Sequence, residues 1–154
     1  MPGIDECLLE AMRLPGARSA AVVDWISGLA LGLAGEPPGG DGEAAACETA
    51  ELARMVAEYR SLGPLAAMAA ESSPPTTAKA PAPAPDAVPA AHHPGAAPAV
   101  EDIIATNSDS YHLLRFVTGA LDGTVFLHLW LARDEGNLAL ARIRLAEIAE
   151  RMVL

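Results

Sequence analysis

The chain has 154 residues, only two cysteines, and a formal net charge of −10 at pH 7. The length suits one ordinary domain. The excess of negative charge argues against a nucleic-acid backbone or an anionic membrane surface as the main partner. Cys7 and Cys47 lie far apart in the sequence. They predict small, buried or half-buried side chains in a reducing compartment rather than a disulfide framework, and we expect the cytoplasm.

The first elements expected are a short helix and an apolar stretch. Apolar residues recur at helical spacing over residues 4–14, and Pro15 and Gly16 end this helix. Residues 19–35 are almost wholly apolar, but the stretch is shorter than a bilayer span and contains Asp24. No positively charged region precedes it, so neither a signal peptide nor membrane insertion is expected.

The apolar stretch instead predicts a β-hairpin. Residues 20–25 form its first strand, residues 29–33 form its second, and Gly28 allows the turn between them. We expect Asp24 to accept backbone hydrogen bonds at this turn, because acidic side chains often do so at turns. Both strands are continuously apolar, so the pattern predicts that both faces of the hairpin are covered.

A strong helix and an unusual segment follow the hairpin. Residues 43–62 are rich in Ala and Glu, with an apolar stripe at Leu52, Met55, Val56 and Tyr59, and residues 65–71 are compatible with a further short helix. Residues 73–99 are mostly Pro and Ala. Such a segment buries too little side-chain surface to offset its ordering entropy, so we expect a disordered, fairly stiff linker.

The remaining sequence predicts three strands and a last helix. The strands are expected over residues 100–106, 111–118 and 124–132, separated by turn-forming residues. Asn137 is a plausible N-cap for an amphipathic helix over residues 138–154. Neither flank of the Pro/Ala segment makes a credible domain alone. Together they predict an α+β fold, in which three helices cover a five-stranded antiparallel sheet in the order αββαβββα. Residues 1–72 and 100–154 then form one split domain, and the linker 73–99 is inserted between the second helix and the third strand.

Two segments of the sequence carry a resemblance to a known family. The segment "GARSAAVVDWISGLALG" holds a Gly-led entry, a strand that ends at Asp24, and a turn at Gly28. The segment "TVFLHLWLARDEGNLALARIRLAEI" holds a last strand, a loop and a C-terminal helix. With the element order, these segments resemble the Roadblock/LC7 family of profilin-like regulatory modules, which includes bacterial partners of Ras-like GTPases. The resemblance covers residues 3–72 and 100–154.

The resemblance implies a homodimer in which two sheets join edge to edge and the second helices pack together. It also implies a small Ras-like GTPase as partner. The candidate dimer or partner surface is the stripe of Leu52, Met55, Val56 and Tyr59. The same stripe could instead cover the chain's own sheet, and one stripe can serve both purposes. A scaffold of the same fold that binds another protein is the alternative function.

Catalytic signatures are absent from the sequence. It contains no P-loop, HExxH, CxxC or G-x-S-x-G pattern, and we expect no enzyme, no cofactor and no metal. His92 and His93 lack nearby ligands to complete a metal site. His112 and His128 lie in neighbouring predicted strands, and with Asp109 or Asp122 they suggest a less favoured general-base arrangement.

The tryptophans and the basic residues of the last helix complete the candidates. Trp25 and Trp130 are expected to anchor the core or a dimer interface, and an exposed Trp at either place would mark a binding hot spot. Arg142, Arg144 and Arg151 are expected on a solvated face.

Overall fold

A computed structural model describes residues 3–71, 98–119 and 123–152 of the chain. Its strands are β1 (Ala17–Asp24), β2 (Leu29–Gly35), β3 (Asp102–Thr106), β4 (Ser110–Val117) and β5 (Val125–Ala132). Its α-helices are α1 (Ile4–Met12), α2 (Gly42–Glu58), α3 (Leu65–Glu71) and α4 (Leu138–Arg151), with 3₁₀ turns η1 (Pro38–Gly40) and η2 (Arg60–Leu62).

The five strands form one antiparallel sheet in the order β2-β1-β5-β4-β3. β1 lies beside β5, so strands from both sides of the Pro/Ala segment pair directly in the same sheet. The predicted five-stranded antiparallel sheet and the order αββαβββα are therefore confirmed, and α3 is the further short helix that residues 65–71 suggested. The expected linker lies largely outside the described residues.

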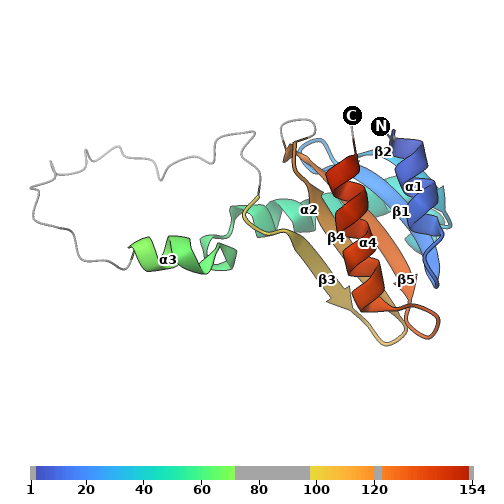
Figure 1. Ribbon diagram of the computed structural model, residues 1–154. Coiled ribbons are helices and arrows are strands. Elements are labelled where there is room, and N and C mark those ends of the chain that lie inside the picture. The colour runs from blue at the N-terminus through green and yellow to red at the C-terminus, as the bar shows by residue number, and fades with distance from the viewer. Residues whose placement is uncertain (1–2, 72–97, 120–122, 153–154) are drawn as a thin grey trace, which may run out of the picture.

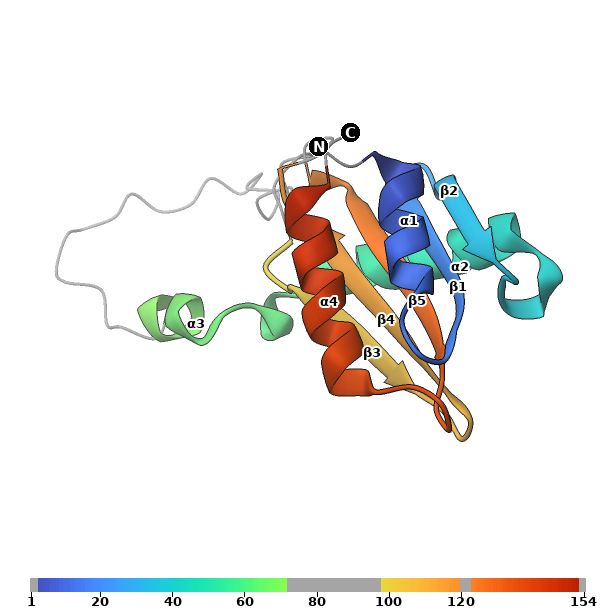
Figure 2. The same ribbon diagram turned by 45° about the vertical axis from the view of Figure 1, so that its right-hand side comes forward.

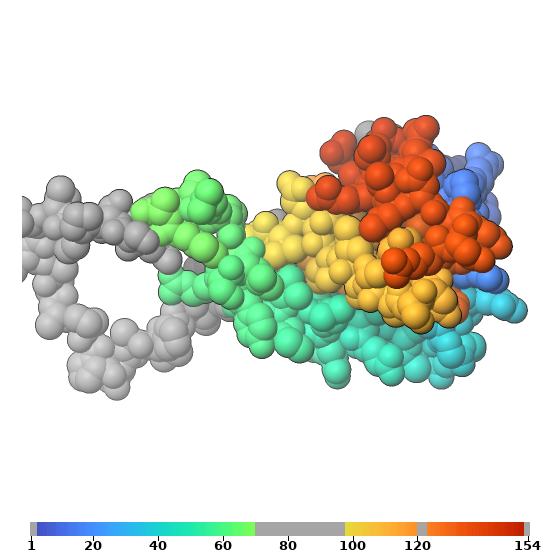
Figure 3. Space-filling model, turned by 90° about the horizontal axis from the view of Figure 1, so that it is seen from below, coloured from blue at the N-terminus to red at the C-terminus, as the bar shows by residue number. Residues whose placement is uncertain are grey.

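Helices cover the two faces of the sheet unequally. α1 and α4 lie side by side on one face, and α2 crosses the other face (Figure 1, Figure 2). The view along the sheet shows three layers, with α4 on one side and α2 on the other (Figure 3). Two apolar clusters fill the spaces between the layers. The α1/α4 side is larger and includes Leu8, Leu129 and Leu145, whereas the α2 side includes Val23 and Phe126.

The hairpin forms as predicted, but its second strand is less covered than expected. Residues 19–23 of β1 are all buried. In β2, exposed residues alternate with half-buried ones, and Leu29, Leu31 and Leu33 are exposed. The expectation that both faces of β2 are covered is therefore wrong. β2 is an edge strand with a neighbour on one side only, so the helices shield only part of its side chains.

Two further expectations need correction. The helix predicted over residues 43–62 ends at Glu58, and Tyr59 adopts an extended conformation before η2. The last buried residue of α2 is Ala53, so the end of the helix lacks the tertiary packing that stabilises helices in proteins. Cys7 is buried as expected, but Cys47 is exposed on α2. Within the described residues, no helix has both the length and the apolar character needed to cross a bilayer.

Candidate interaction surface

Helix α2 packs on its own sheet through alanines. The side chain of Asp41 accepts hydrogen bonds from the backbone N–H groups of Glu43 and Ala44, both at 3.1 Å, and so caps the helix. Ala46, Ala50 and Ala53 follow at helical spacing and are fully or almost fully buried against the sheet. Because these side chains are small, the helix backbone can approach the strands closely.

The candidate stripe predicted from the sequence lies mostly outside this alanine face. Leu52 is half-buried and packs partly on the α2-side core, and Val56 is also half-buried. Met55 is 46% exposed and Tyr59 is 54% exposed. We call these four residues the outer α2 surface. The alanines make the contact between α2 and the chain's own sheet. Most of the outer α2 surface is therefore available for a contact with another protein.

The outer α2 surface continues beyond the helix and lies near an edge of the sheet. Leu62 and Leu65 are exposed in the residues that follow α2. Figure 3 shows α2 running along the sheet and the segment that follows it continuing past β3. Among the described strands, β3 pairs only with β4, so its outer edge is unpaired. An unpaired edge beside exposed apolar side chains is a surface suited to a protein partner.

The two strand histidines lie in direct contact. The Nδ1 atom of His112 is 2.9 Å from the Nε2 atom of His128, so one imidazole N–H donates to the other ring. Trp130 stacks on His112 with ring centroids 6.0 Å apart. Burial, and next the nearby His112, lower the pKa of His128 to about 4. Burial also lowers the pKa of His112. Both rings are therefore neutral at physiological pH.

The histidine pair is not joined to a carboxylate in the described residues. No hydrogen bond or ion pair links His112 or His128 to an acidic side chain there. Asp109 is exposed in the β3–β4 loop, whereas Asp122 and the pair His92-His93 lie outside the described residues. The described part of the chain also holds no group of three or more side chains suited to a metal ion. The structure therefore brings the two predicted histidines together, but among the described residues it does not place an acidic side chain in contact with them.

Asp24 has the role predicted for it. Its carboxylate accepts a hydrogen bond from the backbone N–H of Ile26 at 2.9 Å and one from the Ser27 hydroxyl at 3.1 Å. Its backbone carbonyl accepts from the N–H of Gly28 at 2.8 Å, and Gly28 has a φ of 77°. Asp24 therefore organises the turn between β1 and β2.

The two tryptophans lie in different environments. Trp25 is half-buried at the α2-side core, and its indole N–H points to the carbonyl of Gly123 at 3.4 Å. Trp130 is also half-buried, but its Nε1 atom is buried with no hydrogen-bond acceptor among the described residues. Trp25 therefore packs on the core as expected, whereas Trp130 belongs to neither of the two apolar clusters and retains an unsatisfied donor.

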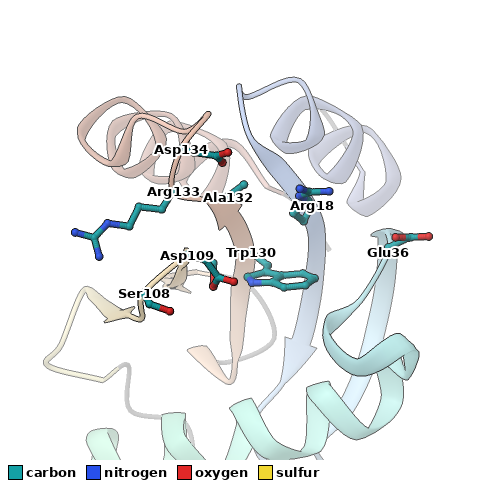
Figure 4. Close-up of a pocket in the computed structure, with 9 residues that line it drawn as sticks. Arg18, Glu36, Ser108, Asp109, Trp130, Ala132, Arg133 and Asp134 are labelled. Atoms are coloured by element: carbon teal, nitrogen blue, oxygen red, sulfur yellow. The ribbon is translucent and has the colours of Figure 1, made fainter.

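Trp130 also lines a cavity that sequence reasoning missed. The cavity has a volume of about 580 Å³ and lies at the end of the sheet where β1 and β4 begin and where β2 and β5 end. Figure 4 shows Arg18 and Asp109 next to the Trp130 ring, and Asp134 farther along the cavity beyond Ala132. These residues come from three separate segments of the chain. The pairing of the strands brings these residues together, and no local sequence pattern predicts that they meet.

The basic residues of α4 are paired rather than merely solvated. Arg142 contacts Asp102 at 2.7 Å, Arg144 contacts Glu147 at 3.0 Å and Arg151 contacts Glu10 at 2.7 Å. Each guanidinium side chain is about half exposed. These pairs tie α4 to β3 and to α1, so the three arginines do not form an unpaired cationic patch.

Comparisons with known proteins identify the fold. No family model matches the sequence, and no curated protein matches it. Solved structures do match. The gliding protein MglB from Thermus thermophilus is 16% identical with a TM-score of 0.59, over 95% of this chain and 82% of that one. Myxococcus xanthus MglB is 15% identical with a TM-score of 0.56, over 94% of this chain and 77% of that one.

A third match is a Roadblock/LC7 domain by name. This domain from Streptomyces avermitilis is 15% identical with a TM-score of 0.55, over 97% of this chain and 93% of that one. At these identities the matches establish the backbone arrangement, which agrees with the sheet order and helix placement described above. The chain has the Roadblock/LC7 fold.

Proposed function

We propose that this chain is a non-catalytic, dimeric interaction module that binds and regulates a small Ras-like GTPase. The observation that carries the proposal is the outer α2 surface, which leaves Met55 and Tyr59 exposed on the helix that runs along the sheet toward the unpaired edge of β3 (Figure 3). The Roadblock/LC7 fold supports the proposal because that family includes bacterial partners of Ras-like GTPases.

Dimerisation would use the outer α2 surface and the β3 edge together. Pairing of two β3 edges would join two sheets and satisfy their unpaired backbone groups. It would also bring the α2 helices of the two copies near each other, because α2 runs along the sheet to β3 and the segment that follows it continues past that strand (Figure 3). Apolar side chains such as Met55 would then be removed from water.

Regulation follows if the dimer prefers one nucleotide state of the GTPase. A binding protein shifts a switch only through its different affinity for the two states. We assign the chain a role in holding the partner's switch loops in one conformation. Cys7 and Cys47 are both free thiols, which suits our expectation of a cytoplasmic location.

Affinity capture tests this proposal. The full chain is immobilised and incubated with lysate of its own cells, once with excess GDP and once with a non-hydrolysable GTP analogue. Enrichment of a small GTPase in one nucleotide state supports the proposal. That GTPase is then purified, and its nucleotide turnover is measured with and without the chain.

A variant in the outer α2 surface sharpens the test. Met55→Glu places a charge on the exposed stripe, and Leu31→Glu places the same charge at an exposed leucine on the opposite sheet edge. Loss of capture with Met55→Glu alone supports the assigned surface. Capture of a different protein, with no GTPase in either state, favours the alternative of a scaffold with the same fold.

A further inference from the structure

We propose that the cavity beside Trp130 binds a basic segment of a partner protein, with an arginine or lysine side chain held between the Trp130 ring and the carboxylates of Asp109 and Asp134. The cavity volume of about 580 Å³ is within the range of small-ligand sites. The α2 helix contributes no lining residue, so this site is separate from the outer α2 surface.

The aromatic surface of the cavity comes from one well-supported ring. His112 stacks on Trp130 with an interplanar angle of 14°, and His128 stacks on His112 in turn. This column holds the indole in place, while the rest of the half-buried ring lines the cavity. Tryptophan is the strongest aromatic partner for a cationic side chain.

The charges around the ring favour a cation. Three acidic and two basic residues line the cavity: Glu36, Asp109, Asp134, Arg18 and Arg133. The guanidinium of Arg133 is already engaged, because it donates to the carbonyl of Asn107 at 3.0 Å and lies 5.5 Å from the centre of the Tyr111 ring.

The directions of the side chains point the same way. Figure 4 shows the guanidinium of Arg133 directed away from Trp130, whereas the carboxylate of Asp109 lies beside the ring. Arg18 is then the one basic group left to balance the acidic groups of the described lining. The net charge of −10 on the whole chain attracts cationic groups at longer range.

The size of the cavity favours a peptide side chain over a simple cation. A volume of about 580 Å³ is far larger than a metal ion needs, and the described residues hold no group of three or more side chains suited to a metal ion. The long arginine or lysine side chain of a protein segment can lie on the Trp130 ring and place its charge beside the carboxylate of Asp109.

The two tryptophans allow a direct test by nuclear magnetic resonance. A ¹⁵N-labelled full chain gives two indole N–H signals, which Trp25→Phe assigns. The probe is an acetylated and amidated Gly-Arg-Gly-Arg-Gly peptide. We expect the Trp130 signal to move saturably, while the Trp25 signal stays in place, because Trp25 is bonded near Gly123 and does not line the cavity.

Charge variants distinguish the site from general attraction to an acidic protein. Asp109→Asn removes a cavity charge at similar size, and Glu135→Gln removes a nearby exposed charge that does not line the cavity. We expect Asp109→Asn to weaken peptide binding by about two- to fivefold and Glu135→Gln to leave it nearly unchanged.

Two outcomes of the titration would overturn the proposal: a Trp130 signal that does not move, or indole signals that both move equally. Equal weakening of peptide binding by Asp109→Asn and Glu135→Gln would also overturn it. So would binding of a Gly-Glu-Gly-Glu-Gly peptide in place of the arginine peptide. No GTPase is used in this experiment, so its outcome is independent of the function proposed above.

Discussion

The Nδ1 atom of His112 lies 2.9 Å from the Nε2 atom of His128, across the pairing of β4 with β5. His128 is 4% exposed, and its ring is covered by His112 on the α2 side of the sheet. A proton added to this pair would bury a charge that no carboxylate in the described residues compensates. Protonation of the buried His128 ring therefore costs stability in the folded chain.

Acid should weaken the fold through His128. Its pKa is about 4 in the folded chain against 6.5 ordinarily, so the unfolded chain binds an extra proton between these values. The free energy of unfolding should therefore fall as the pH drops from 6.5 to 4, by at most about 3 kcal/mol from this residue. Urea unfolding at several pH values measures the effect. His128→Gln does not titrate and should lose clearly less stability over this window, whereas equal losses in both proteins would contradict the assignment.

Self-association should depend on the outer α2 surface. Met55→Glu places a charge where the proposed dimer buries an apolar side chain, and a buried unpaired charge strongly weakens an interface. We expect the dimer dissociation constant to rise by about tenfold or more, measured by sedimentation equilibrium. The free energy of unfolding of the monomer should change little, because Met55 is 46% exposed.

The matched control for this change is Leu31→Glu on the β2 edge. Leu31 is an exposed leucine at the edge of the sheet opposite to β3, so the same new charge should leave the dimer intact. A wild-type chain that stays monomeric at all concentrations would contradict the proposed dimer. Dissociation by Leu31→Glu alone would move the interface to the β2 edge.

Local sequence signals predicted the order of the elements and several side-chain roles. Asp24 and Asn137 act through hydrogen bonds to residues two or three positions away, so neighbouring residues suffice to reveal them. The long apolar run over residues 124–132 likewise predicted a strand, and β5 lies at the centre of the sheet.

Other features depend on where distant segments meet. The composition of β2 resembles that of β1, but only the sheet order shows that β2 is an edge strand with exposed leucines. The sequence did not reveal which side of α2 packs on the sheet, because small alanines face the sheet while larger apolar residues such as Met55 face outward. The Trp130 cavity needs the ends of four strands in register. Periodicity within one segment carries no information about these relationships.

The alanine face of α2 should be intolerant of larger side chains. Ala50 is fully buried between α2 and the sheet, so Ala50→Leu would force the helix away or strain the packing. We expect a loss of about 1–3 kcal/mol in the free energy of unfolding. Ala44→Leu is the matched control, because Ala44 is exposed on the same helix and should tolerate the same change. If the two variants unfolded at the same urea concentration, α2 would not pack on the sheet through its alanines.

Two substitutions of Asp24 can separate its role as a hydrogen-bond acceptor in the turn from the effect of its charge. Asp24→Ala removes both acceptor oxygens and should lower the free energy of unfolding by about 1 kcal/mol, because the hydrogen bonds to Ile26 and Ser27 are lost. Asp24→Asn removes the charge but keeps one acceptor oxygen, so it should cost clearly less. Thermal and urea unfolding measure both effects. Equal losses in the two variants would show that the charge of Asp24, rather than its geometry as an acceptor, stabilises the turn between β1 and β2.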